Sequence, residues 1–189
     1  MLIHRIINTK FSSCTYVIEV AHDQAWVVDC GDVPPLLEAL KHKKLCGILL
    51  THGHFDHIYG LNDVCRMFPE AMVYTNAAGR DALLSDRQNL SRYHETPFTF
   101  HFPERIIVVG DNETIPLSDT LKIRTVATPG HHPSCLTYVT DNVVFTGDSF
   151  IPNVGVVTIL PGGDKALAAK SEELILELSR GSTIYAGHY

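Results

Sequence analysis

The sequence predicts an α/β fold in which two β-sheets are covered on their outer faces by helices. Apolar runs of strand length recur along the chain, and residues 47–50 contain no polar side chain, which is typical of a strand buried on both faces of its sheet. Strands dominate the first part of the chain and return after residue 104, with helical segments between and after them. The 189 residues are 45% apolar and 19% charged, enough apolar material for a substantial core.

The first third of the chain is predicted to consist mainly of strands. A hairpin turn at 21–24 separates the first two, because polar residues interrupt two β-rich runs there. Pro34 and Pro35 suit the first turn of a helix, which we expect to extend to Lys43. The strands expected in this part are 15–20, 25–29 and 45–50.

The middle and last parts of the chain alternate helices with further strands. Helical spacing covers 58–68, ending before Pro69, and 77–84. Residues 86–104 show no sustained hydrophobic period, and we interpret them as a surface excursion that overhangs the functional site described below. Asp164 is the expected N-cap of the best helix, 164–178, and Gly181 its C-terminal stop. The remaining expected strands are 71–75, 105–109, 121–127, 136–140, 143–146 and 182–186.

Charge and composition restrict the class of partner. The net charge of −6 and the pI of about 6.0 argue against a general nucleic-acid-binding protein, which would need a basic face. No apolar run reaches the length of a membrane span, and the first residues lack the apolar core of a secretory signal. Five cysteines occur singly, without a CxxC motif. We therefore expect a cytoplasmic protein with a small-molecule substrate, no nucleic-acid or membrane partner, and an oligomeric state that the sequence does not indicate.

The densest group of metal-ligand side chains follows the apolar run 47–50, in the segment Thr51-His52-Gly53-His54-Phe55-Asp56-His57. In extended backbone, positions two apart face the same way, so His52 and His54 can converge on one cation. Asp56 and His57 come one turn later and can reach a second cation. Imidazole and carboxylate ligands suit zinc, iron or manganese.

Three further candidate ligands have the same setting as this first group. His131, Asp148 and His188 each follow a predicted strand and stand directly after a glycine. The ends of neighbouring strands gather at one edge of a sheet, and glycine allows the backbone to bend close to an ion. The recurrence favours one shared metal site over three unrelated turn residues.

Taken together, the HxHxDH motif, Thr128-Pro129-Gly130-His131, Gly147-Asp148 and Gly187-His188 resemble the metallo-β-lactamase superfamily, and within it the glyoxalase II-like branch. The similarity extends over nearly the whole chain. It implies an αββα four-layer sandwich of two mixed sheets with outer helices. It also implies that residues 1–189 form a single domain, without the C-terminal helical extension that binds glutathione in true glyoxalase II.

The resemblance further implies two metal sites with a shared carboxylate. His52, His54 and His131 would hold one metal, Asp56, His57 and His188 the other, with Asp148 bridging them. The expected cofactors are two divalent ions, with zinc favoured over iron and manganese. Two such ions lower the pKa of a shared water and produce hydroxide at neutral pH. Asp56 is also the predicted catalytic residue, which would orient this nucleophile.

These inferences predict a metal-dependent hydrolase that cleaves a thioester or small ester through a metal-bridging hydroxide. The net positive charge of such a site favours an anionic substrate. The alternatives are a mononuclear-iron oxidoreductase resembling persulfide dioxygenases, a metal-binding scaffold without turnover, and a β-lactam hydrolase. The β-lactam hydrolase is the weakest of these alternatives, because drug-hydrolysing relatives are typically exported and we expect no secretory signal here.

The chain departs from the glyoxalase II-like pattern at two places. After His131 it continues with His132-Pro133-Ser134-Cys135. We interpret His132 as a solvent-facing loop residue, the alternatives being a residue that supports a metal ligand or one that contacts the substrate, and Cys135 as a buried small side chain. Residues 149–160 are largely apolar where relatives often carry a Gly-Arg pair. In the excursion at 86–104, aromatic residues are expected to pack in the core or on the surface; they are Tyr93, Phe98, Phe100 and Phe102.

Overall fold

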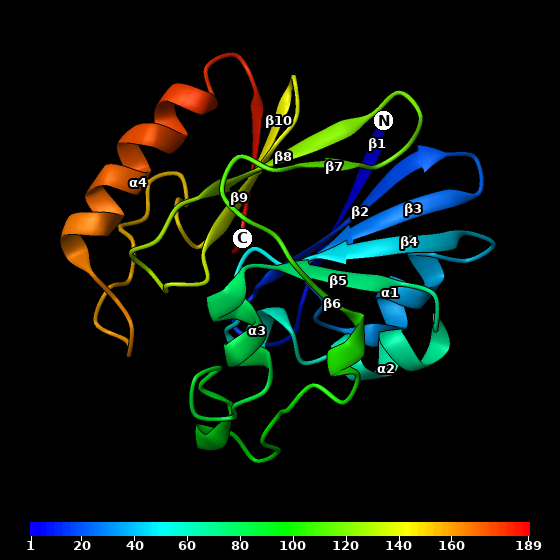
Figure 1. The fold of residues 1–189 in the computed structure, drawn as a ribbon, viewed down its shortest axis with the longest axis horizontal. Helices are drawn as coiled ribbons and strands as arrows, with labels where there is room; N and C mark the ends of the chain where they lie inside the picture. The colour runs from blue at the N-terminus through cyan, green and yellow to red at the C-terminus, as the bar shows by residue number, and fades with distance from the viewer.

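The computed structural model describes residues 1–189 as two mixed β-sheets with helices on their outer faces, which confirms the predicted fold class (Figure 1). The first sheet has the order β1-β2-β3-β4-β5-β6 and the second the order β11-β10-β9-β8-β7. The strands of the first sheet are β1 (Leu2–Ile7), β2 (Cys14–Ala21), β3 (Gln24–Val28), β4 (Lys44–Leu49), β5 (Met72–Thr75) and β6 (Ile106–Val108). Those of the second are β7 (Thr114–Pro116), β8 (Lys122–Ala127), β9 (Leu136–Val139), β10 (Val143–Gly147) and β11 (Thr183–Ala186).

The helices lie on opposite sides of the pair of sheets. In Figure 1 the helices of the first half of the chain lie beside the first sheet, and the long helix near the C-terminus lies beside the second. The four are α1 (Val33–Ala39), α2 (Leu61–Met67), α3 (Ala77–Leu83) and α4 (Lys165–Leu178). The chain also contains three short 3₁₀ helices: η1 (Phe55–His57), η2 (Ser91–Tyr93) and η3 (Pro103–Arg105). None of the helices combines the length and the apolar character that a bilayer crossing requires.

The alternation of side chains along the strands of the first sheet divides the core into two layers. In β3, Trp26 and Val28 belong to the cluster between the sheets, whereas Ala25 and Val27 belong to the cluster beneath α1 and α2. Because both faces of β3 are covered, polar residues are excluded from either position, and the run 25–28 is apolar throughout. This is why the apolar run before Thr51 predicted a buried strand.

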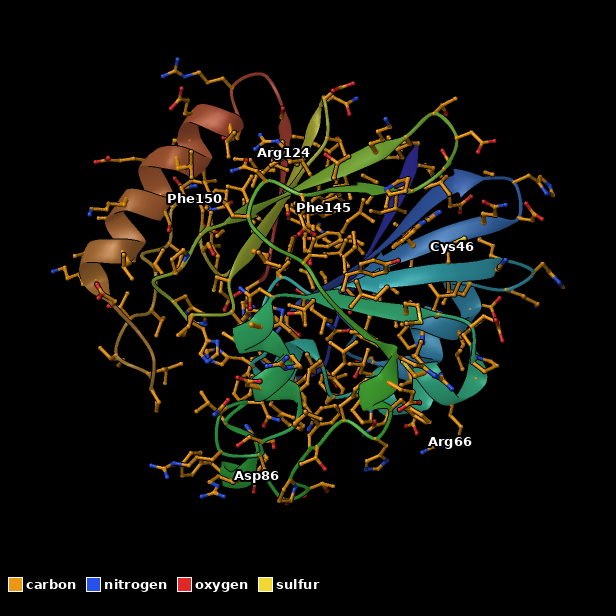
Figure 2. The ribbon with its side chains drawn as sticks, viewed as in Figure 1. Cys46, Arg66, Asp86, Arg124, Phe145 and Phe150 are labelled. Carbon is orange, nitrogen blue, oxygen red and sulfur yellow. The ribbon has the colours of Figure 1, made fainter.

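The two sheets are joined by apolar packing and by hydrogen bonds across the interface. Phe145 of the second sheet points into the space between the sheets (Figure 2) and is fully buried there. The Tyr138 hydroxyl donates to the Leu50 carbonyl at 2.9 Å, and Trp26 Nε1 donates to the Leu117 carbonyl at 3.0 Å. These bonds satisfy the polar ends of two large aromatic residues that would otherwise be buried without partners.

Two helix boundaries differ from the prediction. The helix expected to reach Lys43 ends at Ala39, and His42 adopts a left-handed backbone with φ 64°, which a continuing helix cannot contain. The helix expected from residue 58 begins at Leu61. The preceding backbone is paired elsewhere, because the His57 carbonyl accepts from the Cys30 amide and the Gly60 amide donates to the Cys30 carbonyl.

Two strands were not predicted, and one predicted segment is more deeply buried than expected. β1 and β7 are edge strands with mostly exposed or short sequences, so they lack the apolar run that identifies a buried strand. The excursion at 86–104 is only partly a surface feature: Phe98 and Phe100 are 6% and 4% exposed within the core cluster, whereas Tyr93 is 75% exposed. In the same segment, the amide side chain of Asn89 is fully buried and donates to the backbone carbonyls of Ala82 and Phe98.

The N-cap of α4 offers a test of local stability. The Asp164 carboxylate accepts from the backbone amides of Ala166 and Leu167 at 2.8 and 3.0 Å, as the sequence predicted for an N-cap. Asp164→Ala should lower the free energy of unfolding by about 1 kcal/mol, which corresponds to about 2–4 °C in melting temperature for a chain of this size. Asp164→Asn retains an acceptor and should melt close to the parent protein. Equal melting temperatures for all three proteins, followed by circular dichroism, would contradict the capping role.

Candidate metal centre

The candidate ligands converge because four strands end at the same place. β10 and β11 are parallel, and β8 and β10 are both antiparallel to β9, so β8, β10 and β11 all point in one direction. The end of β4 joins them from the first sheet, where the Leu136 amide donates to the Thr51 carbonyl at 2.7 Å. The structure thus brings all seven predicted side chains to one edge of the two sheets.

Two glycines allow this close approach. Gly147 has φ +51°, and a Cβ there would lie 2.5 Å from Thr51, in the loop that follows β4 of the opposite sheet. At Gly187 a Cβ would lie 2.1 Å from Asp148 Oδ1. A larger residue at either position would therefore separate the strand ends or displace the carboxylate, which supports the role that the sequence suggested for glycine here.

The first group of possible ligands consists of three buried imidazoles. One ring nitrogen from each of His52, His54 and His131 lies within 4.8 Å of the others. His54 Nδ1 and His131 Nε2 are 2.8 Å apart. Burial, followed by the effect of neighbouring histidines, lowers the pKa of both His52 and His54 well below the usual value, so both rings are neutral and have a lone pair available for a metal.

The second group lies beside the first and is less deeply buried. Ligand atoms of Asp56, His57 and His188 also lie within 4.8 Å of one another. Asp56 Oδ2 is 3.4 Å from both His57 Nε2 and His188 Nε2. Burial disfavours the charged form of His57, but the carboxylates of Asp56 and Asp148 outweigh it and raise the pKa of that ring.

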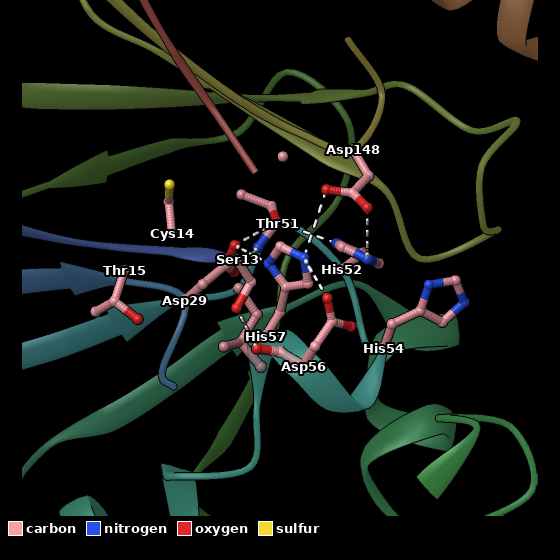
Figure 3. Close-up of polar contacts among 12 residues, drawn as sticks. Ser13, Cys14, Thr15, Asp29, Thr51, His52, His54, Asp56, His57 and Asp148 are labelled. Atoms are coloured by element: carbon pink, nitrogen blue, oxygen red, sulfur yellow. Dashed lines mark hydrogen bonds and ion pairs between the residues drawn. The ribbon is translucent and has the colours of Figure 1, made fainter. Parts of the chain in front are cut away.

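Asp148 stands between the two groups. Figure 3 shows its carboxylate reaching from the second sheet toward His52 and His57. Its Oδ1 lies 3.4 Å from His57 Nε2, and its Oδ2 lies 3.2 Å from His188 Nε2 and 3.5 Å from His131 Nε2. Burial raises the pKa of this carboxyl group, but the nearby His57 and the hydrogen bond from His188 have the larger combined effect and hold it well below its usual range.

The residues present fit a pair of divalent cations. Four buried side-chain polar atoms lack a hydrogen-bond partner, and three of them belong to this centre: His52 Nε2, His54 Nε2 and Asp148 Oδ1. Buried polar atoms are almost always paired, so three unpaired ones within a single cluster indicate a missing ligand. The donors are imidazole nitrogens and carboxylate oxygens, which suit zinc, iron and manganese.

Asp29 supports the centre by contacting His57 and Thr51, and the sequence analysis gave it no role. Its carboxylate accepts from the Thr51 amide and hydroxyl, both at 2.7 Å, and lies 2.9 Å from His57 Nδ1. It therefore fixes the ring of a candidate ligand and the backbone before His52 at the same time. The signal was present in the sequence, because Asp29 directly follows a buried strand, as the candidate ligands do.

The interpretation of His132 as solvent-facing is wrong. The residue is 7% exposed, its Nδ1 lies 2.6 Å from Ser134 Oγ, and its ring centre is 4.8 Å from that of His54. Burial, with a smaller effect of His131, lowers its pKa to about 4. Ser134 Oγ also accepts from the Gly53 amide at 2.9 Å, so this short loop holds the HxH segment in place. Cys135 is 1% exposed, which confirms the buried small side chain that was predicted.

His188 is fixed by the loop between β1 and β2. Its Nδ1 lies 2.9 Å from the Phe11 carbonyl, and residue 188 forms an antiparallel bridge with Ser13. Ser13 Oγ in turn donates to the Asp56 carbonyl at 2.7 Å. One loop therefore positions two members of the second group, although they are far apart in the sequence.

Comparison with known proteins agrees with this geometry. The model of the metallo-beta-lactamase superfamily matches residues 8–188. An uncharacterized protein of Aquifex aeolicus is 28% identical over 181 residues, covering 94% of this chain and 84% of that protein. A hydroxyacylglutathione hydrolase of Pseudoalteromonas translucida is 32% identical over 128 residues, covering 67% of this chain and 41% of the relative. The chain thus spans less than two thirds of the length of that hydrolase.

Solved structures show the same fold. The BLEG-1 B3 metallo-beta-lactamase superposes with a TM-score of 0.90 at 28% identity, covering 100% of this chain and 92% of the other. ETHE1 from Myxococcus xanthus superposes with a TM-score of 0.77 at 22% identity, covering 100% and 76%. The second of these similarities is one of fold.

The support given by Asp29 can be tested through metal affinity. Removing a carboxylate that orients a metal-binding histidine typically weakens metal affinity by about 10- to 100-fold. Asp29→Ala should therefore raise the dissociation constant for the more weakly held zinc ion by that factor, as measured with a chromophoric chelator. Asp86→Ala, on the surface beside Arg92, is the matched control and should bind zinc like the parent protein. Unchanged affinity in a folded Asp29→Ala variant would contradict this role.

Proposed function

The chain belongs to the metallo-β-lactamase superfamily, and we propose that it is a dinuclear metal-dependent hydrolase acting on a thioester or a small ester. The observation that carries the proposal is the cluster of seven donor side chains that includes Asp148, with three buried donor atoms left unpaired. The proposed ligands are those expected from the sequence: His52, His54, Asp56, His57, His131, Asp148 and His188. Zinc is the proposed metal, with iron and manganese as alternatives.

The chemistry divides between the metals and the protein. When bound, two divalent cations would supply Lewis acidity toward the substrate carbonyl and a hydroxide nucleophile at neutral pH. The protein supplies a cavity of about 400 Å³ bordered by His54, His131, Asp148 and His188, together with apolar side chains that limit the access of water. Asp56 is one of two carboxylates that border this cavity. It can accept a hydrogen bond from the attacking water and so fix its orientation.

The choice of a thioester rests on relatives and on leaving-group chemistry. Several relatives with 27–32% identity are named hydroxyacylglutathione hydrolase, a name that describes cleavage of a glutathione thioester. A thiolate leaves without a strong general acid, and His94 is the one imidazole in the cavity lining that is not a proposed ligand. A small, anionic substrate and a cytoplasmic location belong to the same proposal.

A second function is favoured by one subset of the ligands. His52, His57 and Asp148 form a group of two histidines and one carboxylate with ligand atoms within 4.8 Å. Such a set is typical of mononuclear iron oxygenases. A persulfide dioxygenase-like oxidoreductase is therefore the alternative, and it predicts one iron per chain with dioxygen uptake.

Metal content separates the two functions and tests the ligands. Protein purified without added metal should contain close to two equivalents of metal, mainly zinc, when measured by plasma mass spectrometry. His54→Ala should lose at least one equivalent, because it removes a buried donor of the first group. His22→Ala changes an exposed histidine in a hairpin turn and should retain the parent content. One equivalent of iron together with sulfite production from a persulfide would overturn the hydrolase.

Turnover tests the function itself. The parent protein should release thiol from hydroxyacylglutathione or a related thioester, detected with a disulfide reagent. Asp56→Ala should lower kcat by about 100-fold or more, since it removes a group that positions the nucleophile and a ligand of the second site. Asp119→Ala, an exposed loop residue between β7 and β8, is the control. A binding scaffold without turnover would be indicated if metal content were the sole property that Asp56→Ala changed.

A further inference from the structure

The cavity over the candidate metal centre has apolar walls without lysine or arginine. Its floor is formed by the centre itself, and its walls by Phe11, Phe55, Leu90, Val157 and Leu160. A second cavity of about 360 Å³ continues from it and shares His131, Asp148, Val157 and His188. Neither cavity is lined by lysine or arginine. Away from the centre itself, a charged group along these walls would therefore lose its hydration without gaining a side chain of opposite charge.

The segment after Asp148 supplies most of the apolar surface of the second cavity. Ile151, Val154 and Val157 line it, and the last two are 56% and 48% exposed. Several apolar side chains exposed together beside a site indicate a surface that contacts an apolar ligand. This segment is the part of the sequence that departs from the glyoxalase II-like pattern, so a different ligand chemistry is expected there.

The opposite side of the centre is polar. A cavity of about 570 Å³ borders the first one and shares Phe55 and His94 with it. Its lining includes Lys10 and Arg66, but Arg66 is paired with Asp63 at 2.6 Å. Lys10 takes part in none of the ion pairs found within 4 Å. Its ammonium group lies 5.5 Å from the centre of the Phe55 ring, at the boundary between the two cavities.

We propose that the substrate is a thioester whose acyl group is an apolar chain lying along residues 151–160, and whose leaving thiol carries an anionic group that Lys10 binds. The inference rests on the proposed hydrolase function and adds to it the orientation of the substrate across the centre. Hydrolysis would add water across the acyl C–S bond, giving a carboxylic acid on the apolar side and a thiol on the side of Lys10. The anionic character expected of the substrate is thereby assigned to its leaving group.

Binding of inert thioethers tests the apolar side without any turnover. S-methyl-, S-butyl-, S-hexyl- and S-octylglutathione are titrated into the metal-loaded protein by calorimetry. Affinity should increase by about three- to fourfold for each methylene that the cavity buries. In the Val154→Ser/Val157→Ser variant the dissociation constant of the octyl compound should rise on the order of tenfold, while that of the methyl compound stays unchanged.

Ile159→Ser is the matched control for the apolar side. Ile159 lies in the same segment and is 92% exposed, but it borders neither cavity, so its replacement should leave the chain-length dependence intact. An affinity that is independent of chain length in the parent protein would overturn the inference. Equal effects of Ile159→Ser and the double variant would overturn it as well.

The leaving-group side is tested by hydrolysis of octanoyl thioesters of glutathione, which is anionic, and of N-acetylcysteamine, which is neutral. Lys10→Met should raise KM for the glutathione thioester by about two- to fivefold, as expected for an exposed ionic contact, with kcat unchanged and no effect on the neutral thioester. Lys170→Met, on the exposed face of α4, is the control. An equal rise in KM for both thioesters would contradict the role of Lys10. A chain-length trend in binding without hydrolysis of any thioester would reject the hydrolase and support the apolar site.

Discussion

The structure depends on the burial of one carboxylate among imidazoles. Asp148 has a side chain that is 12% exposed, and four histidine rings lie within 4.0 Å of its oxygens. An isolated carboxylate in such a position would be strongly destabilising, so the surrounding histidines, and the cations that fit between them, are what make it tolerable. That requirement explains why four strand ends from two sheets must meet within a few ångströms, and why glycine stands at positions 147 and 187, where the backbone comes closest.

Much of the fold and all the proposed ligands could be predicted because both depend on local patterns. Strands buried on two faces are apolar throughout, and the polar residue that follows each one stands out against that background. The same rule would have identified Asp29, which was passed over because it is a single acid without a neighbouring histidine. His132 was misjudged for a different reason: its burial is produced by the loop at 159–163 and by Ser134, and contacts between distant segments leave no periodic signal. The edge strands β1 and β7 escaped prediction because an exposed strand needs no apolar run.

The second group of candidate ligands depends on backbone contacts more than the first does. Phe11 and Ser12 both adopt left-handed conformations, with φ 54° and 55°, which non-glycine residues rarely adopt. The turn they form directs the Phe11 carbonyl to His188 and the Ser12 carbonyl to the amide of Tyr189. Asn8 strengthens the same loop by donating to Ser13 and Thr15. The strained backbone at Phe11 and Ser12 thus fixes the candidate ligand His188. The hydrogen bonds around this turn offset the energetic cost of the strain.

The residues proposed to carry the chemistry and the residues that surround the substrate lie in different parts of the fold. The candidate ligands sit at strand ends, where sheet hydrogen bonds and the close contacts of glycine leave little freedom. The walls of the cavities come from three loops, around residues 11, 90–94 and 151–160, whose side chains are partly or largely exposed. Side-chain substitutions in these loops change what surrounds the substrate, whereas the contacts from the loops to the candidate ligands are made by backbone carbonyls: that of Phe11 lies 2.9 Å from His188 Nδ1, and that of Val157 lies 2.8 Å from His131 Nδ1. Val154 and Val157 also lie outside the two core clusters. The same centre can therefore serve substrates of different chemistry, and the apolar composition of residues 151–160 is the feature of this chain that selects among them.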